Sequence, residues 1–190
     1  MGGQYHRNIQ QTEKLNGTNY SPIFPYRGQQ FKIDNRKNGG TSRTWYNYQK
    51  LYNLIYGKID NHNIDFHEGV FITEVNSSPS LKTKDADTSS IEFRKKALLT
   101  SEFFQNFPVV IISGLGYFEI SKNRNEIEEI FGVKFTHKLI ASNKDSQAYW
   151  IHEGVNPPKL LINTRQLSIG VSDALLEGIA KEIRDSGLHL

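Results

Sequence analysis

Three polar turns that follow apolar runs hold the side chains best suited to chemistry in this sequence. The first turn carries Asn76 and Ser77, the second begins at Gly114, and the third begins at Asn163 and includes Arg165. An Asn side chain donates and accepts hydrogen bonds at once, which suits it to holding a water molecule or to contacting the edge of a nucleobase. The same residues also allow a simpler interpretation, in which Asn76 closes an Asx turn within its own loop.

The third turn, residues 163–170 (NTRQLSIG), is the most informative of the three. Arg165 offers five donors and a permanent positive charge, and both suit a phosphate group. Gln166 and Ser168 add donors just before an expected helix, whose N-terminus also favours anions. The alternative is an ordinary polar loop in which Arg165 pairs with a surface acid.

The other chemical patterns in the sequence are weak. The second turn contains a lone Gly-x-Gly without a third Gly, a matching acid or a Walker lysine, so a dinucleotide-binding fold is disfavoured. His62 and His67 are too far apart for one helical zinc site, and the spacing of Glu92 and Lys95 is that of an ordinary ion pair. We therefore expect no metal centre and no cofactor.

These turns need elements to position them, and short apolar β-branched runs alternate with helical patterns along the chain. Strands are expected at 69–75 (GVFITEV), 108–114 (PVVIISG), 134–142 and 159–163, and helices at 44–59, 90–106, 125–131 and 171–184. This alternation predicts a three-layer α/β/α domain with a central, mostly parallel four-stranded sheet. Ligands of such sheets bind beyond the carboxyl ends of the strands, so the three turns should meet at one rim.

Charge divides the sequence into an arm, residues 1–40, and an α/β domain, residues 41–190. The chain has 190 residues and a net charge of +3, but nine Lys and Arg stand against three Asp and Glu up to Asp60. This basic part is also rich in Tyr, Phe and Trp. Cations neutralise phosphates and flat rings stack on bases, so the part suits nucleic acid. The alternative is a solvated arm whose aromatic side chains pack onto the domain.

Composition excludes several further classes of protein. The chain has no Cys, which excludes disulfides, thiol nucleophiles and Cys-ligated metals. No stretch approaches the roughly 18 apolar residues of a membrane span, and the N-terminus MGGQYHRNIQ has no apolar leader. We therefore expect a cytoplasmic protein without a membrane partner.

Taken in order, the apolar runs and their turns resemble the uracil-DNA glycosylase superfamily over about residues 45–185. The matching stretches are VFITEVNSSPS at 70–80, FPVVIISG at 107–114 and LLINTRQLS at 160–168. The resemblance implies that Asn76 positions the attacking water and that Phe93 stacks on the base. Asn163 stands where that family has the His that stabilises the departing uracil. Glu74-Val75 replace the Gly that opens the family's first motif.

The resemblance implies a DNA glycosylase-like protein that binds a flipped uracil or modified base and hydrolyses its N-glycosidic bond. Because the family's carboxylate and His are missing, a catalytically inactive nucleotide- or nucleic-acid-binding module of the same fold is the alternative. The expected catalytic residues are Asn76 and Asn163. The expected substrate-binding residues are Ser77, Phe93, Gly114, Arg165, Gln166 and Ser168. The sequence leaves open which base is bound, whether the partner is DNA or RNA, and the oligomeric state.

Overall fold

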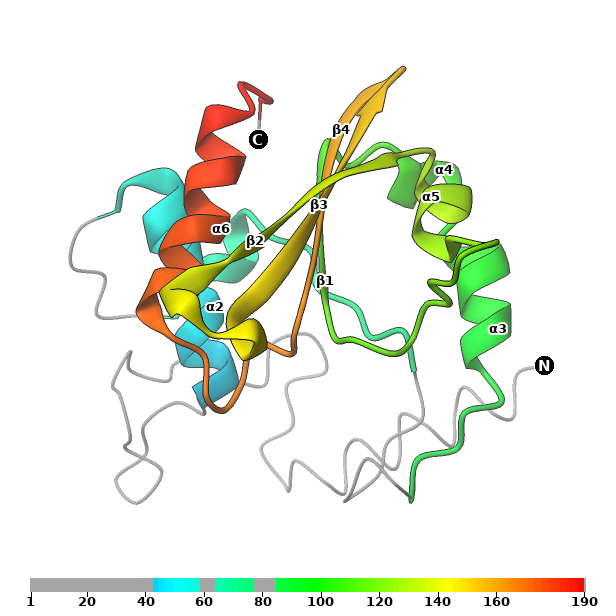
Figure 1. Ribbon diagram of the computed structural model, residues 1–190, viewed down its shortest axis with the longest axis horizontal. Helices are drawn as coiled ribbons and strands as arrows, with labels where there is room; N and C mark the ends of the chain where they lie inside the picture. The colour runs from blue at the N-terminus through cyan, green and yellow to red at the C-terminus, as the bar shows by residue number, and fades with distance from the viewer. Residues whose placement is uncertain (1–42, 59–63, 77–84, 190) are drawn as a thin grey trace.

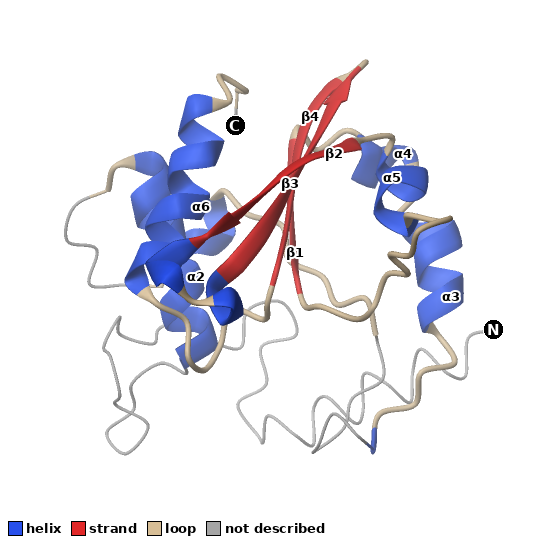
Figure 2. Cartoon of the chain, in the orientation of Figure 1, coloured by secondary structure: helices blue, strands red, loops and turns tan. Residues whose placement is uncertain are grey.

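The computed structural model describes residues 43–58, 64–76 and 85–189, so the arm expected over residues 1–40 lies outside the described residues. Within them, helices lie on both sides of a four-stranded sheet, and the chain has an α/β fold (Figure 1, Figure 2). None of the described helices is long and apolar enough to cross a membrane.

The sheet is mixed rather than mostly parallel. Its strands are β1 (Val109–Ser113), β2 (Lys134–Ile140), β3 (Ala148–Val155) and β4 (Pro158–Thr164), in the spatial order β1-β4-β3-β2. β1 pairs in parallel with β4, whereas β4 with β3 and β3 with β2 are antiparallel. Short turns join β2 to β3 and β3 to β4. Two strands joined in this way pair antiparallel, because a parallel pair would need a crossover of about a dozen residues. The expectation of a mostly parallel sheet is therefore wrong for the described strands.

Three of the four expected strands are confirmed, and the remaining one is replaced by another. Residues 69–75 form no strand, and they follow the short 3-10 helix η2 (Phe66–Glu68) as irregular chain. The aromatic ring of Phe71 instead packs on Phe103 and Phe107, at centroid distances of 5.2 and 5.9 Å. β3 was not expected, because its sequence AYWIHEGV interrupts the apolar pattern with polar residues and Gly.

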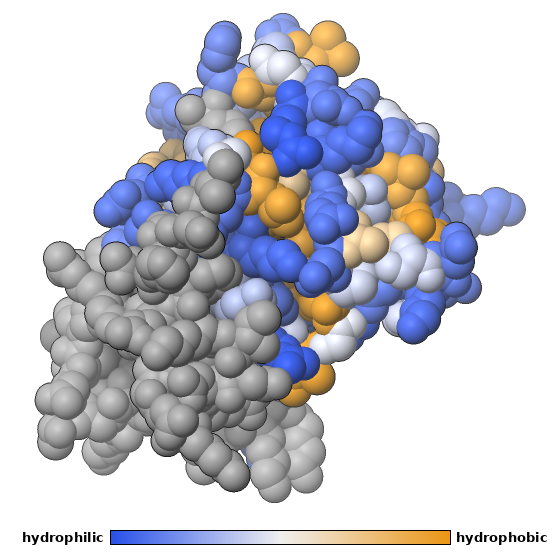
Figure 3. All heavy atoms as spheres, turned by 90° about the vertical axis from the view of Figure 1, so that its left-hand side faces the viewer, coloured by the Kyte–Doolittle hydropathy of each residue, from blue (hydrophilic) through white to orange (hydrophobic). Residues whose placement is uncertain are grey.

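Two helices cover what we call the first face of the sheet. They are α2 (Arg43–Tyr56) and α6 (Asp173–Asp185), and they pack on Tyr149, Ile151 and Ile162. Ser172 caps α6, since its side chain accepts a hydrogen bond from the backbone N–H of Leu175. Seen from the side that these helices form, hydrophilic side chains cover much of the described surface, with apolar groups between them (Figure 3).

Shorter helices cover the second face. They are α3 (Ile91–Phe93), the π-helical turn η4 (Arg94–Leu98), α4 (Glu102–Gln105) and α5 (Glu126–Phe131), which is capped by Asn125. The single helix expected over 90–106 is thus broken after Leu98. There the Thr100 and Ser101 hydroxyls donate to the backbone carbonyls of Lys96 and Leu98, at 2.6 Å each. Such hydroxyls compete for helical carbonyls and favour a break.

Candidate functional site

A cavity of about 930 Å³ opens on the second face of the sheet, beside the start of α5. Strands β2, β3 and β4 supply its floor, and the segment from 115 to 125 together with α5 supplies its walls. Its lining residues are Leu115, Ile120, Ser121, Lys122, Asn123, Arg124, Asn125, Glu128, Glu129, Lys134, Phe135, Trp150, His152 and Asn163.

Strand register explains why the floor residues meet. Trp150 pairs with Asn163 on β4 and with Lys138 on β2, so these three side chains form one row on the second face. The next row contains Phe135 and His152. The β2 ladder shifts register between Phe135 and His137, and a bulge of this kind turns the following side chains to the other face. Phe135 and Lys138 thereby point to the same side of the sheet although they lie three residues apart.

Asn163 is a buried polar residue on this floor. Its side chain is 5% exposed and makes no hydrogen bond to any described residue. Its donor and its acceptor are therefore both free to bind a ligand in the cavity.

His152, beside Asn163 on the floor, is electrically neutral at ordinary pH. The residue is 2% exposed, and its Nδ1 atom has no hydrogen-bond partner in the described part of the chain. Burial lowers the pKa of His152, against the opposing influence of the Trp150 and Leu161 carbonyls and of the Glu128 charge. The floor thus presents polar but uncharged groups.

Aromatic and aliphatic side chains form the apolar part of the cavity. Phe135 packs edge-on against His152, with centroids 5.6 Å apart, and Lys138 holds its ammonium 5.6 Å from the centre of the Trp150 ring. Leu115 and Ile120, on the opposite wall, are 53% and 57% exposed. A flat ligand could stack on such a surface while its edge reaches the Asn163 amide.

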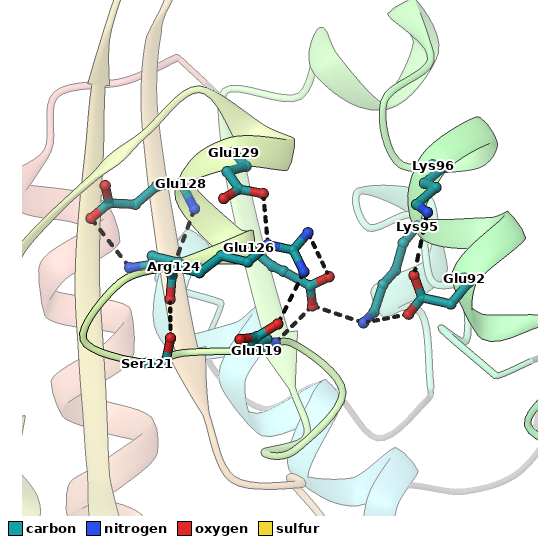
Figure 4. Close-up of polar contacts among 10 residues, drawn as sticks. Glu92, Lys95, Lys96, Glu119, Ser121, Arg124, Glu126, Glu128 and Glu129 are labelled. Atoms are coloured by element: carbon teal, nitrogen blue, oxygen red, sulfur yellow. Dashed lines mark hydrogen bonds and ion pairs between the residues drawn. The ribbon is translucent and has the colours of Figure 1, made fainter.

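A network of ion pairs fixes the wall formed by residues 119–129 (Figure 4). The Arg124 guanidinium contacts the carboxylates of Glu119 at 3.0 Å, Glu129 at 3.2 Å and Glu126 at 3.3 Å. Glu126 is buried, and it also accepts hydrogen bonds from the backbone N–H of Glu119 at 2.7 Å and from Lys95 Nζ at 2.8 Å. Arg124 is thus held in place by three neighbouring acids.

Lys95 joins this network to the π-helical turn. Its Nζ contacts Glu92 at 3.1 Å, which confirms the ion pair expected from their spacing. Burial lowers the pKa of Lys95, but the hydrogen bonds to Glu126 and Glu92 outweigh this effect and raise it overall. The side chain is therefore a charged, buried support of the cavity wall.

Glu128 ties α5 to the beginning of β2 at the cavity rim. Its carboxylate accepts hydrogen bonds from Lys134 Nζ at 2.8 Å and from the backbone N–H of Phe135 at 3.0 Å. The bond from Lys134, followed by that from Phe135, lowers the pKa of Glu128. The rim thus carries an ionised carboxylate at neutral pH.

Two of the three polar turns singled out in the sequence meet at the end of the parallel strand pair. The backbone N–H of Gly114 donates to the carbonyl of Thr164 at 2.9 Å, and Ser113 Oγ accepts from the N–H of Leu167 at 2.9 Å. The second and third turns are therefore side by side. Only Asn163, among the expected site residues that are described, lines the cavity.

Arg165 binds backbone oxygens of its own neighbourhood. Its two Nη atoms donate to the carbonyls of Ser146, Ile169 and Gly170 at distances of 3.0–3.2 Å. The guanidinium thereby fastens the third turn to the chain before β3, and it does not pair with a surface acid among the described residues. Neither Gln166 nor Ser168, from the same turn, lines the cavity, and the carbonyl of Ser168 accepts a hydrogen bond from Asn47 at 2.8 Å.

The first turn, of which Asn76 is described, is not part of the cavity lining. Arg94 donates to the carbonyl of Glu74 at 3.0 Å and to Thr73 Oγ1 at 2.9 Å, which anchors the segment to η4. Desolvation raises the pKa of the Glu74 carboxyl, while the charge of Arg94 opposes the rise. Asn76 follows two residues later, Ser77 lies outside the described residues, and Phe93 is 68% exposed on α3.

Sequence reasoning missed Trp150, Phe135 and His152 as site residues. The signal that could have found two of them is the alternation within β3, where Tyr149 and Ile151 face the apolar core while Trp150 and His152 face the cavity. Such alternation is typical of a strand whose two faces meet different surroundings.

Comparisons with protein-family models, with curated proteins and with solved structures find no match for this chain. Within residues 43–58, 64–76 and 85–189, no three His, Asp or Glu side chains gather as the ligands of a metal ion would.

Proposed function

We propose that this protein binds a planar heterocycle with an amide edge, such as a nucleobase, in the cavity on the second face of the sheet. The observation that carries the proposal is the Asn163 side chain, which is buried, lines the cavity and has no partner among the described residues. An Asn amide presents one donor group beside one acceptor, and so does the lactam edge of a pyrimidine or purine. Two matched hydrogen bonds would satisfy both groups of Asn163.

The apolar lining supports a flat ligand. Trp150 neighbours Asn163 across the β3–β4 pair, so a ring held by the amide would lie next to the indole. Stacking of a base on an aromatic side chain contributes about 1–3 kcal/mol. The volume of about 930 Å³ lies in the range of small-molecule sites and leaves room for a sugar as well as a base.

Tryptophan fluorescence offers a direct test, because the chain has two Trp residues and only Trp150 lines the cavity. In a Trp45→Phe background, we expect uracil, guanine or their nucleosides to change Trp150 fluorescence saturably. Asn163→Ala should weaken the binding at least about tenfold, the equivalent of about 1.4 kcal/mol for lost hydrogen bonds to a buried amide.

Asn106→Ala serves as the matched control, since Asn106 is exposed at the end of α4 and lies outside the cavity lining. It should leave the affinity unchanged, and thermal melting should show that both Ala variants are folded. The proposal is wrong if none of the bases and nucleosides binds. It is also wrong if the Asn163→Ala variant binds them as tightly as the protein that retains Asn163.

A second candidate is hydrolysis of the N-glycosidic bond of a bound base, as the resemblance to uracil-DNA glycosylases implies. Its support is the meeting of the second and third turns beside Asn163, together with the helices on both faces that suit a three-layer α/β/α arrangement. We expect the wild type to release uracil from single- or double-stranded DNA, and Asn76→Ala to lose this activity. Absence of release above background from the wild type would remove the candidate and leave binding alone.

A further inference from the structure

We propose that His152 is a positioning residue of the cavity floor, and that the cavity binds its ligand through the uncharged form of this ring. The inference rests on the proposed function, because it concerns the same cavity and the same ligand. Its basis is the place of His152 in the lining, two residues after Trp150 on β3 and in edge-on contact with the ring of Phe135 on β2.

The immediate surroundings of His152 give a charged ring no acceptor for its second proton. The residue is buried, and its Nδ1 atom has no hydrogen-bond partner in the described part of the chain. Its neighbours in the strand pairing are Phe135 on β2 and Leu161 on β4, which are both apolar. Both nitrogens of a protonated imidazole are donors, and a buried charge without partners is costly. The ring can therefore take up a proton only if the floor opens and admits water.

Charged groups of the neighbouring elements do not overcome this effect. On the second face they are Glu128 and Glu129 on α5, Lys122 and Arg124 in the wall, Lys134 and Lys138 on β2, and Lys159 on β4. Burial lowers the pKa of His152 below its ordinary value of 6.5, while the Trp150 and Leu161 carbonyls and the Glu128 charge oppose the shift without reversing it. Glu128 is itself bound by Lys134 Nζ at 2.8 Å and by the N–H of Phe135 at 3.0 Å.

A ligand on the floor favours the neutral ring. A base that is held by Asn163 and stacked on Trp150 fills the space through which water would reach His152. Binding and protonation therefore oppose each other, and a proton on the free protein must leave before the ligand binds. Linkage of one proton weakens the affinity by up to tenfold for each pH unit below the pKa of the free protein. Because that pKa is lowered, the loss appears only in acid.

The test follows the binding of uridine to the Trp45→Phe protein from about pH 8 to about pH 5, a range in which uridine carries no charge. We expect the affinity to stay constant down to about pH 6.5 and to fall at least about threefold by about pH 5, since His is the side chain that ordinarily titrates there. Thermal melting at each pH should show that the protein remains folded.

Two substitutions attribute the pH dependence to one histidine. His152→Phe keeps a flat ring that binds no proton, so this variant should bind uridine with the same affinity at all of these pH values. His137→Gln is the matched control, because His137 is exposed on β2 and lies outside the cavity lining. This variant should retain the full pH dependence.

A second measurement needs no substitution in the cavity and covers the case in which His152→Phe does not fold. Proton NMR of the imidazole signals, with the His152 ring identified by its contact with Phe135, reports the pKa of that ring directly. Uridine should lower the pKa of His152 and leave that of His137 unchanged.

The outcomes separate this inference from the proposed function. If neither uridine nor guanosine binds at about pH 7.5, the proposed function itself fails. If uridine binds as tightly at pH 5 as at pH 7.5, the proposed function stands and the inference is overturned. The inference is also overturned if folded His152→Phe keeps the pH dependence, or if uridine leaves the pKa of the His152 ring unchanged.

Discussion

At the scale of single residues, the buried Lys159 shows how an isolated cation responds to pH. Its side chain lies near the start of β4, 4% exposed, and Nζ donates to the backbone carbonyl and the side-chain oxygen of Gln105 at 2.9 and 3.1 Å. No carboxylate contacts it among the described residues. Burial therefore lowers the pKa of Lys159 below its ordinary value of 10.5.

This shift predicts a stability that rises with pH. Between the lowered pKa of the folded protein and the ordinary value near 10.5, the unfolded chain binds more protons than the folded one. The contribution of Lys159 to the free energy of unfolding therefore increases as pH rises through that window. Lys159→Met should remove this increase, which urea unfolding of both proteins from about pH 7 to pH 10.5 would reveal as a changing difference. A constant difference would contradict the prediction.

Some residues of the candidate site could be identified from the sequence, and others could not. Asn163 was identified because it follows an apolar run and begins a polar turn, and the structure places it in the cavity. Trp150 and His152 could not be identified in this way, because their strand was not recognised. Arg165 looked like a phosphate ligand from its type alone, and the folded turn commits its guanidinium to backbone carbonyls.

At the scale of elements, α6 lies close to the sheet at Gly178. A Cβ atom at this position would lie 2.7 Å from Tyr149 Oη and 3.2 Å from the carbon that carries it. Tyr149 is 5% exposed within the core of the first face, so its ring has little room to withdraw. The small residue thus allows α6 to approach β3.

Gly178→Ala tests which of two opposing effects is larger. Ala favours the helix by about 1 kcal/mol over Gly, whereas overpacking a core costs about 1–3 kcal/mol. We expect overpacking to win and the free energy of unfolding to fall by about 1 kcal/mol. In a Tyr149→Phe background, where the hydroxyl is absent, the same substitution should be neutral or stabilising. Denaturant unfolding of the four proteins would show this, and a stabilised single variant would refute the explanation.

Apolar runs in the sequence predict some strands of this fold correctly and one incorrectly. The runs VVIIS and KLLIN predict strands correctly, because β-branched and aliphatic residues fill both faces of a buried strand. The run GVFITEV has the same composition, yet Phe71 packs among other aromatic rings outside the sheet. An apolar run indicates burial, but it does not state whether the partner is a strand or a cluster of rings. It also does not state the direction of pairing, so the antiparallel pairing of β2, β3 and β4 could not be read from it.

At the scale of the whole molecule, the buried pair of Lys95 and Glu126 connects the helices of the second face to the cavity wall. Their side chains are 7% and 6% exposed, and the charged atoms are 2.8 Å apart. Removing one member of a buried pair leaves the other charge without compensation, which costs about 3–5 kcal/mol. The pair should therefore matter to the stability of the entire fold.

Glu126→Gln should lower the free energy of unfolding by about 3 kcal/mol or more, because Lys95 then keeps only its contact with the exposed Glu92. Glu92→Gln is the matched control. Its carboxylate is 61% exposed, and exposed ion pairs contribute less than about 1 kcal/mol. Chemical unfolding of the three proteins would compare the losses, and equal losses in the two variants would contradict the assigned role.

The mixed sheet has a consequence for how the chain acquires its structure. β2, β3 and β4 follow one another along the chain and pair as neighbours, whereas β1 pairs with a strand that comes after all of the others. Contacts between residues close in sequence form sooner, since less chain entropy is lost in closing them. We therefore expect the three-stranded meander to assemble first and β1 to dock last. Asn163 acquires its β1 neighbour only at that step, so the floor of the cavity is completed at the end of folding.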